Sequence, residues 1–239
     1  MHARALAVSL LVLLVSGSAS ARMPDRATLG PGRFESVLPS SPTATEAVVG
    51  RFRMDRTPVT NAQFLTFVRT HTNWRRDRVA RLFADKAYLA HWQAPTSLGS
   101  RAAANQPVTN VSWFAAKAYC AAQSARLPTW HEWEFAAAAD EKSKDARQDP
   151  AWRQRILDWY GKPSSRALSD VARQPPNYYG LHDLHGLVWE WVLDHNALLV
   201  SNDSREQRGA DRSRFCGEGA LSLDDRENYA VLMRIALLS

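Results

Sequence analysis

Two helix starts lie within one short stretch, residues 105–137, and they constrain the fold more than any other feature of the chain. At the first, Ser112 precedes a run in which Trp113, Ala116 and Tyr119 recur at the spacing of one helix face. A serine hydroxyl in this position accepts a hydrogen bond from an otherwise unpaired amide of the first turn. The pattern therefore predicts a helix that begins directly after Ser112.

The second start is a capping box. Thr129 is followed three residues later by Glu132, and in such a pair each side chain accepts a hydrogen bond from the other residue's backbone amide. Pro128 disfavours the helical conformation in the residue before it, so we expect the first helix to stop at Arg126–Pro128. The stretch thus predicts two short amphipathic helices joined by an extended link.

A similar start occurs earlier in the chain. Thr60 and Gln63 form another capping box, and apolar residues then recur at helical spacing, which predicts a helix over Asn61–Thr70. Before it, Val48–Met54 alternates partly between apolar and polar residues, as in a strand.

Three segments have weaker patterns. Residues 72–104 carry many charges and are expected to be irregular, with a short helix near Arg81–Tyr88. The polar, helix-prone segment Ala136–Arg155 is expected to form a solvent-facing insertion. Ile156–Tyr179 is expected to be rich in loops, because it contains a Pro-Pro pair.

The chain of 239 residues begins like a secretory signal. Arg4 precedes the apolar run Ala5–Val15, and Ala19-Ser20-Ala21 has the form of a cleavage site. We therefore expect a signal peptide over residues 1–21, a loose lead-in over 22–47 and one domain over 48–239, in a periplasmic or secreted protein. An uncleaved anchor is the alternative, although the apolar run is short for a membrane span.

The chain has a net charge of +6, and its basic residues are scattered along the sequence. The densest basic patch is Arg75-Arg76 with Arg78, and nucleic-acid binding would require that patch to extend into a stripe. We expect a solvated basic surface, with no nucleic-acid partner and no membrane span once the signal is removed.

Two groups of short strings stand out in the chain. The first group is Val111-Ser112-Trp113, Ala118-Tyr119-Cys120 and Arg126-Leu127-Pro128-Thr129 with Glu132-Trp133-Glu134. The second is Gly180-Leu181 followed by Asp183 and Gly186-Leu187-Val188-Trp189-Glu190-Trp191. Together they resemble the signature of the formylglycine-generating enzyme family, the sulfatase-modifying factors. The resemblance implies an α+β domain, a variant of the C-type lectin fold with short strands, few helices and much irregular structure.

The last of these strings has the chemistry of a calcium site. Calcium takes several oxygen ligands, from carboxylates and backbone carbonyls together. The resemblance implies a structural Ca²⁺ held by the side chains of Asp183 and Glu190 and by the carbonyls of Gly186 and Val188. In the alternative reading, Asp183 caps a turn and Glu190 pairs with an arginine.

Three histidines lie nearby, His182, His185 and His195. Imidazole commonly binds zinc, copper or iron, but the spacing is not that of a helical zinc pair. We expect these side chains to be exposed or to form hydrogen bonds.

The cysteines depart from the family pattern. The family uses two cysteines near the C-terminus to bind Cu(I) and activate oxygen, but the corresponding region, Asp224–Ile235, contains none. Cys216 lies upstream and alone, and it is the one candidate for a catalytic thiol there. A single thiolate does not provide a two-coordinate Cu(I) site.

The family's terminal Gly-Phe-Arg-Cys is not found either, because the chain ends at Leu237-Leu238-Ser239. We therefore expect a domain that lacks its C-terminal end and leaves apolar surface uncovered. In the family the cysteine that matches Cys120 is bonded to that terminal cysteine. Here Cys120 is expected either to be a buried free thiol or to pair with Cys216.

The departures resemble one branch, the NirV-type proteins associated with copper nitrite reductase. This resemblance implies an accessory or maturation factor for a copper enzyme, with a secreted protein client. Two alternatives are a copper- and oxygen-dependent oxidase that converts a protein cysteine to formylglycine, and a ligand-binding module. The residues that carry the branch resemblance are Phe215-Cys216-Gly217, Gly219, Asp224, Tyr229-Ala230, Met233-Arg234 and the string from His185 to Val192.

Overall fold

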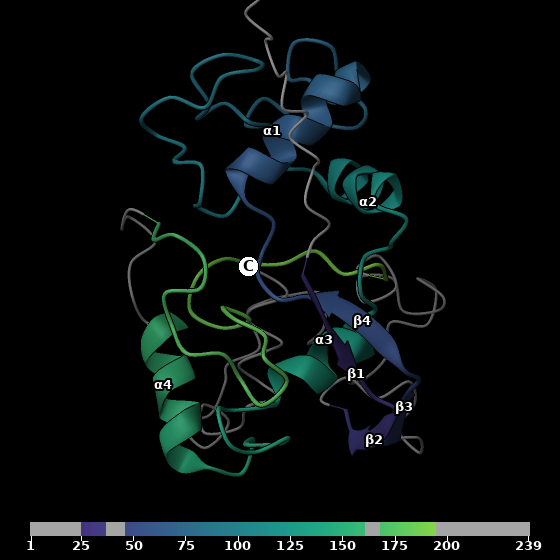
Figure 1. Cartoon of the computed structure of the whole chain (residues 1–239), viewed down its shortest axis with the longest axis vertical. Coiled ribbons are helices and arrows are strands. Elements are labelled where there is room, and N and C mark those ends of the chain that lie inside the picture. The colour runs from purple at the N-terminus through teal and green to yellow at the C-terminus, as the bar shows by residue number, and fades with distance from the viewer. Residues whose placement is uncertain (1–24, 37–45, 161–167, 195–239) are drawn as a thin grey trace, which may run out of the picture.

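The structure is a computed structural model that describes residues 25–36, 46–160 and 168–194. Figure 1 shows two stacked halves. One half holds the helices α1 (Asn61–Thr70) and α2 (Trp113–Ala122), and the other holds α3 (Trp130–Ala137), α4 (Pro150–Tyr160) and four short strands. This arrangement confirms a mixed α+β fold with few helices and short antiparallel strands.

The strands form two separate antiparallel pairs. β1 (Arg26–Leu29) pairs with β4 (Phe52–Asp55), and β2 (Gly32–Glu35) pairs with β3 (Glu46–Val49). The single strand expected over 48–54 is therefore wrong: the chain breaks after β3 and enters the other sheet. The loose lead-in expected over 22–47 is also wrong for residues 26–35, which form β1 and β2.

The turn between β1 and β2 explains the first break. Gly30 has a φ of +69°, a backbone conformation that residues with a Cβ rarely adopt. β1 buries Ala27 and Leu29 on alternate positions, and these pack with Ala136 of α3 and with Leu181. Each sheet therefore gains its stability from packing on the rest of the domain, because a two-stranded sheet is marginal alone.

The capping boxes are confirmed. Thr60 and Gln63 exchange hydrogen bonds at the start of α1, which has the predicted bounds, and Thr129 and Glu132 do so at the start of α3. Ser112 accepts a hydrogen bond from the amide of Ala115 at the start of α2.

The predicted end of α2 is wrong by a few residues. The helix stops at Ala122, before the influence of Pro128, because Ser124 adopts a left-handed conformation with φ +52°. The amide of Ala125 then donates to the carbonyl of Cys120 at 2.9 Å. A local reversal of the backbone, rather than the proline, ends this helix.

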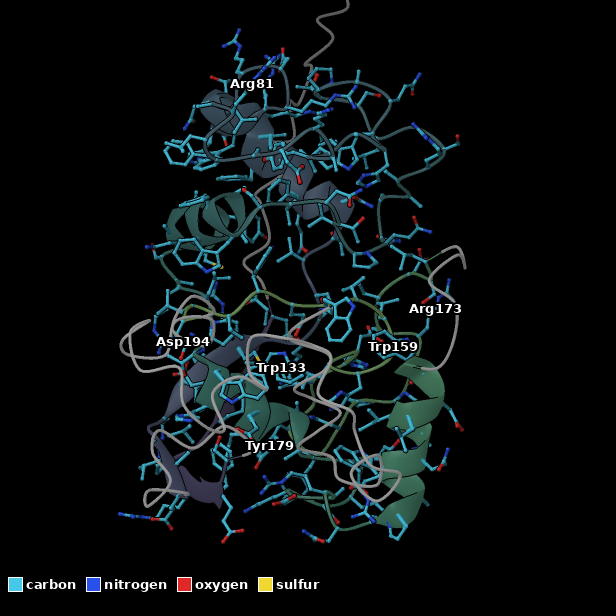
Figure 2. The ribbon with its side chains drawn as sticks, turned by 180° about the vertical axis from the view of Figure 1, so that it is seen from behind. Arg81, Trp133, Trp159, Arg173, Tyr179 and Asp194 are labelled. Carbon is cyan, nitrogen blue, oxygen red and sulfur yellow. The ribbon has the colours of Figure 1, made fainter. Side chains whose placement is uncertain are left out.

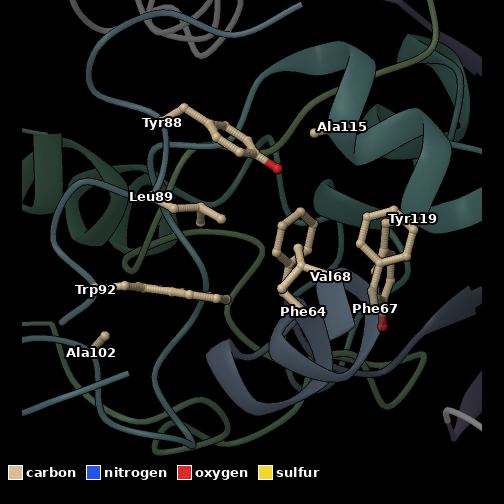
Figure 3. Close-up of a cluster of buried hydrophobic side chains, with 9 residues drawn as sticks. All are labelled: Phe64, Phe67, Val68, Tyr88, Leu89, Trp92, Ala102, Ala115 and Tyr119. Carbon is tan, nitrogen blue, oxygen red and sulfur yellow. The ribbon is translucent and has the colours of Figure 1, made fainter. Parts of the chain in front are cut away.

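One aromatic core joins α1 to α2 and to the irregular segment between them (Figure 3). The indole N–H of Trp92 donates to the buried side chain of Asn61 at 3.0 Å, and Asn61 donates to the carbonyl of Ala103 at 3.0 Å. Segment 72–104 is irregular as expected, but residues 81–88 form turns instead of the predicted helix. The core residues are Phe64, Phe67, Val68, Tyr88, Leu89, Trp92, Ala102, Ala115 and Tyr119.

The segment after α3 departs most from expectation. Ala136–Ala139, Ala146 and Trp152 are buried, whereas residues 141–145 and 148–151 are exposed. The expected solvent-facing insertion is therefore wrong for the buried positions and holds for the residues between them. α4 continues through Ile156, which is also buried, and it shortens the expected loop region. Within the described ranges, no helix combines the length and the apolar character needed to cross a membrane.

Candidate functional site

Two reciprocal hydrogen bonds join the halves of the signature. The indole of Trp113 donates to the carbonyl of Val192 at 2.9 Å, and the indole of Trp191 donates to the carbonyl of Val111 at 2.9 Å. The amide of Leu193 donates to the carbonyl of Pro128 at 2.7 Å. Segment 188–194 therefore lies between the two halves of the molecule (Figure 1).

A cavity of about 630 Å³ lies beside this junction. All of β4 lines it, and α2 contributes Ala116, Tyr119 and Cys120. Further walls include residues 57–59, residues 124–128, two side chains of α3 and parts of segment 181–191. A cavity of this size, formed where several elements meet and lined by aromatic and charged groups, is the default candidate for a binding site.

No strand of the described residues pairs with the second edge of β4, and this edge faces the cavity. The amide of Arg56 donates to the carbonyl of Asp25, and hydrogen-bonded pairs alternate along an antiparallel ladder. The register Arg26–Asp55 then places the backbone N–H and C=O of Arg53 and Asp55 away from β1. In agreement, every residue of β4 lines the cavity, whereas among the described residues β1 contributes only Arg26.

Two ion pairs fix the cavity wall. Arg26 contacts Asp55 at 2.7 Å across the sheet. Arg126 donates to both carboxylate oxygens of Glu132, at 2.6 and 2.7 Å, and these hydrogen bonds hold the pKa of Glu132 below its usual value. Arg53 is exposed and forms no ion pair within the described part of the chain.

Cys120 is the thiol that faces the cavity. It is half-buried on α2, and burial, with the nearby charge of Asp55, raises its pKa to about 11. The thiol is therefore protonated near neutral pH and is a poor nucleophile and metal ligand. Cys216, the candidate for catalysis and for a disulfide with Cys120, lies outside the described residues, as does Asp224–Ile235.

The expected calcium ligands lie in the turn that borders the cavity. Asp183 adopts φ +62° and accepts a hydrogen bond from the amide of Ala172 at 2.6 Å. Glu190 accepts one at 2.6 Å from the indole of Trp133, a residue that Figure 2 labels near the middle of the molecule. Burial raises the pKa of Asp183; burial and the charge of Asp183 raise that of Glu190 to about 7.

This donor set fits a hard cation. Burial disfavours the ionised form of both carboxyl groups, and a neighbouring positive charge would offset that cost. Gly186 and Val188 lie in the turn between them. Asp183 does cap a turn, as the alternative reading has it, but Glu190 bonds a tryptophan and pairs with no arginine among the described residues. The calcium site stays a prediction.

The histidines form hydrogen bonds with backbone carbonyls. His182 donates to the carbonyl of Gln174 and His185 to that of Ala137, each at 2.9 Å. Burial lowers the pKa of His185 to about 4, so its ring is neutral at physiological pH. His195 lies outside the described residues, and residues 25–36, 46–160 and 168–194 contain no group of three or more His, Cys, Asp or Glu side chains that could hold a metal.

Sequence reasoning missed the charged side of the cavity. Arg26, Arg53 and Asp55 line it, yet none belongs to the signature strings. The alternation of Arg51, Arg53 and Asp55 with Phe52 and Met54 was the available signal, because it marks one apolar and one polar strand face.

The fold and the site define a mixed α+β domain built around two tryptophan-bearing motifs and a cavity between them. The profile of the family described as "Sulfatase-modifying factor enzyme 1-like domain" matches residues 11–230, and the chain belongs to this family. The resemblance to formylglycine-generating enzymes is therefore confirmed at the level of the family.

Three relatives illustrate the range of the family. "Inactive C-alpha-formylglycine-generating enzyme 2" of Bos taurus is 34% identical over 205 residues, 69% of this chain and 66% of the relative. The formylglycine-generating enzyme of Mus musculus is 32% identical over 147 residues, 54% and 40% of the two chains. Hercynine oxygenase of Mycobacterium tuberculosis is 31% identical over 160 residues, which are 60% of this chain and 38% of the relative. The matches thus span about two thirds or less of each relative's length.

Proposed function

We propose that this protein is an atypical sulfatase-modifying-factor-domain protein that binds an exported client as an accessory or maturation factor and does not oxidise it. One observation carries the proposal: the full chain has only two cysteines, Cys120 and Cys216, and none in Asp224–Ile235, the region that corresponds to the family's cysteine pair. Cys120 lines the cavity as a half-buried thiol whose pKa burial raises to about 11. Cu(I) chemistry of the family type needs two thiolates, whereas a protonated, half-buried thiol suits a packing role.

The comparisons support a role without formylglycine formation. The relative from Bos taurus carries the word "inactive" in its name and aligns over more of this chain than the mouse formylglycine-generating enzyme does. Because hercynine oxygenase also belongs among the relatives, the fold alone does not specify one reaction.

The edge of β4 that no described strand covers supports binding of an extended client segment. Backbone N–H and C=O groups of Arg53 and Asp55 face the cavity, and a strand added there would satisfy them. Such an edge provides affinity through the main chain, while the aromatic and charged walls provide selectivity.

The client we propose is an exported copper enzyme such as nitrite reductase. We propose this client because the chain resembles the NirV-type proteins. Most of the residues that carry this resemblance lie beyond Asp194, outside the described residues. A structural Ca²⁺ at Asp183 and Glu190 would order the turn beside the cavity, and the domain would be a variant of the C-type lectin fold. The signal-like start at residues 1–21 motivates a periplasmic or secreted location.

A matched pair of variants on α2 tests client binding in the cavity. Ala116 lines the cavity, whereas Ala122 is exposed on the same helix and does not line it. The probe is urea-unfolded, metal-free copper nitrite reductase, immobilised and then returned to buffer, with folded enzyme as the comparison. We expect Ala116→Trp to abolish binding and Ala122→Trp to retain it. Equal binding by both variants, or no binding by the wild type, would contradict the proposal.

A further inference from the structure

Apart from the cavity, an exposed apolar ridge lies at one end of the molecule. Leu82 is 81% exposed, Phe83 is 39% exposed and Phe114 is 44% exposed. Their neighbour Arg81 lies at the end of the long axis in Figure 2. We use the name "aromatic ridge" for Leu82, Phe83, Phe114, Trp74 and Trp113.

The rings of the ridge contact one another in a row. Trp74 contacts Phe83 with ring centroids 6.2 Å apart, Phe83 contacts Phe114 at 5.2 Å, and Phe114 contacts Trp113 at 5.4 Å. The hydroxyl of Tyr88 donates to the carbonyl of Trp74 at 2.8 Å and ties the row to the core. The ridge is therefore a fixed surface with exposed apolar side chains.

Basic residues are dense in the sequence on both sides of Leu82 and Phe83. Residues 75–86 contain five Lys or Arg and two Asp residues. Arg75 pairs with Asp77 at 2.7 Å, and Arg76 donates to backbone carbonyls, among them that of Trp92 at 2.7 Å. The remaining basic residues are exposed and form no ion pair within the described ranges: Arg78, Arg81, Lys86 and Lys117.

We propose that the aromatic ridge is a peripheral membrane-binding surface that takes anionic phospholipid. Leu82 is 81% exposed, and exposed basic residues flank it in sequence. Apolar side chains beside basic ones are the combination that binds an anionic membrane interface. Aromatic and aliphatic side chains would enter the headgroup region, and the exposed cations Arg78, Arg81 and Lys86 would face lipid phosphates. Lys117 lies over the ring of Trp113, 4.8 Å from its centroid.

Leu82, Phe83 and Phe114 do not line the cavity, whereas Trp113, at the other end of the row, bonds Val192 at the junction beside it. Membrane contact through Leu82 and Phe83 therefore leaves the cavity open to a client.

Vesicle sedimentation with the full chain tests this proposal. The probes are vesicles of phosphatidylcholine alone and of phosphatidylcholine mixed equally with phosphatidylglycerol. We expect binding to the anionic vesicles at least about tenfold tighter than to the neutral ones, and weaker binding as salt concentration rises. No binding to anionic vesicles would overturn the proposal.

Matched variants separate the ridge from a general charge effect. Leu82→Asp and the double variant Arg78→Glu/Arg81→Glu should each weaken binding by about tenfold or more. Val48→Asp, at a residue 60% exposed in β3, and Lys142→Glu, at another exposed site, should bind like wild type. Equal losses in these controls would overturn the proposal.

A soluble acidic polymer distinguishes a lipid from an acidic protein partner. We expect polyglutamate to compete only weakly with anionic vesicles for the protein. We also expect wild type and Leu82→Asp to bind polyglutamate equally. Binding of polyglutamate as tight as that of anionic vesicles, with Leu82→Asp without effect on either, would replace the lipid by an acidic macromolecule and overturn the proposal. Circular dichroism of each variant should match wild type, because every substituted residue is exposed.

Discussion

Trp113 and Trp191 each donate an indole hydrogen bond to the segment that carries the other: Trp113 to the carbonyl of Val192 and Trp191 to that of Val111, both at 2.9 Å. The two tryptophans belong to motifs almost eighty residues apart in sequence. Their reciprocal bonds join the start of α2 to the last described segment. They therefore hold the two halves of the molecule together beside the cavity.

Removal of either indole N–H should destabilise the domain. Trp113→Phe and Trp191→Phe each retain an aromatic ring but leave a carbonyl without its donor, and we expect a loss of about 1 kcal/mol in the free energy of unfolding. The double variant should lose less than the sum, because the two bonds join the same segments. Urea unfolding measures this, with Tyr178→Phe at an exposed site as a control expected to change stability by less than about 0.5 kcal/mol. Unchanged stability in both single variants would show that the junction is not held by these bonds.

Two glycines at the strand breaks should respond differently to alanine. A Cβ at Gly30, where φ is +69°, would collide with the carbonyl of Gly50, so Gly30→Ala should destabilise the protein by about 2 kcal/mol or more. A Cβ at Gly50 would meet no atom within 4 Å, and Gly50→Ala should be neutral or stabilise by about 0.5 kcal/mol. Thermal unfolding of both variants tests this difference. Similar Tm values for Gly30→Ala and Gly50→Ala would refute the described turn.

Glu132 should contribute to acid sensitivity. Its pKa is below the usual value in the folded protein because Arg126 donates hydrogen bonds to it. The stabilisation is therefore complete above the unfolded-state pKa, about 4.3, and is lost as the pH falls through the lower folded-state pKa. Glu132→Gln should cost about 1–2 kcal/mol at pH 7 and much less near pH 3. Urea unfolding of both proteins across this range tests the sign; a constant difference would contradict it.

Calcium should stabilise the protein through Asp183. At a concentration hundredfold above the dissociation constant, binding adds about 2.7 kcal/mol to the free energy of unfolding and raises Tm by roughly 5–10 °C. A chelator should reverse this, and Asp183→Asn should abolish the response. Glu141→Gln, at an exposed carboxylate far along the chain, should retain it. If wild-type protein melts at the same temperature with calcium and with chelator, the site is refuted.

Cys120 should react slowly. With a pKa of about 11, the thiolate fraction at pH 8 is on the order of 100-fold lower than for an unfolded cysteine of pKa about 8.5. In the Cys216→Ala variant, which isolates this thiol, iodoacetamide should modify the folded protein correspondingly more slowly than the urea-unfolded protein. A native rate equal to the unfolded rate would mean that the thiol is available for chemistry, against the proposed function.

The sequence is most informative where short-range hydrogen bonds decide the structure. Thr60, Ser112 and Thr129 mark three helix starts correctly because a cap depends on residues within one turn. The end of α2 at Ser124 and the burial of Trp152 depend on backbone reversal and on contacts with distant segments, which no local pattern encodes. For the same reason the cavity could not be predicted: its walls come from β4, α2 and the turn after Asp183, and only the fold brings them together.

The most direct test of the central claim is mass spectrometry of a cysteine-containing sulfatase peptide after incubation with the full chain, Cu(I), a thiol reductant and air. An active formylglycine-generating enzyme serves as the positive control. A binding protein without the family's oxidase chemistry should leave the peptide cysteine unchanged while the control converts it. Conversion to the formylglycine aldehyde by this chain, and its loss in the Cys216→Ala variant, would contradict the account and identify the protein as an oxidase.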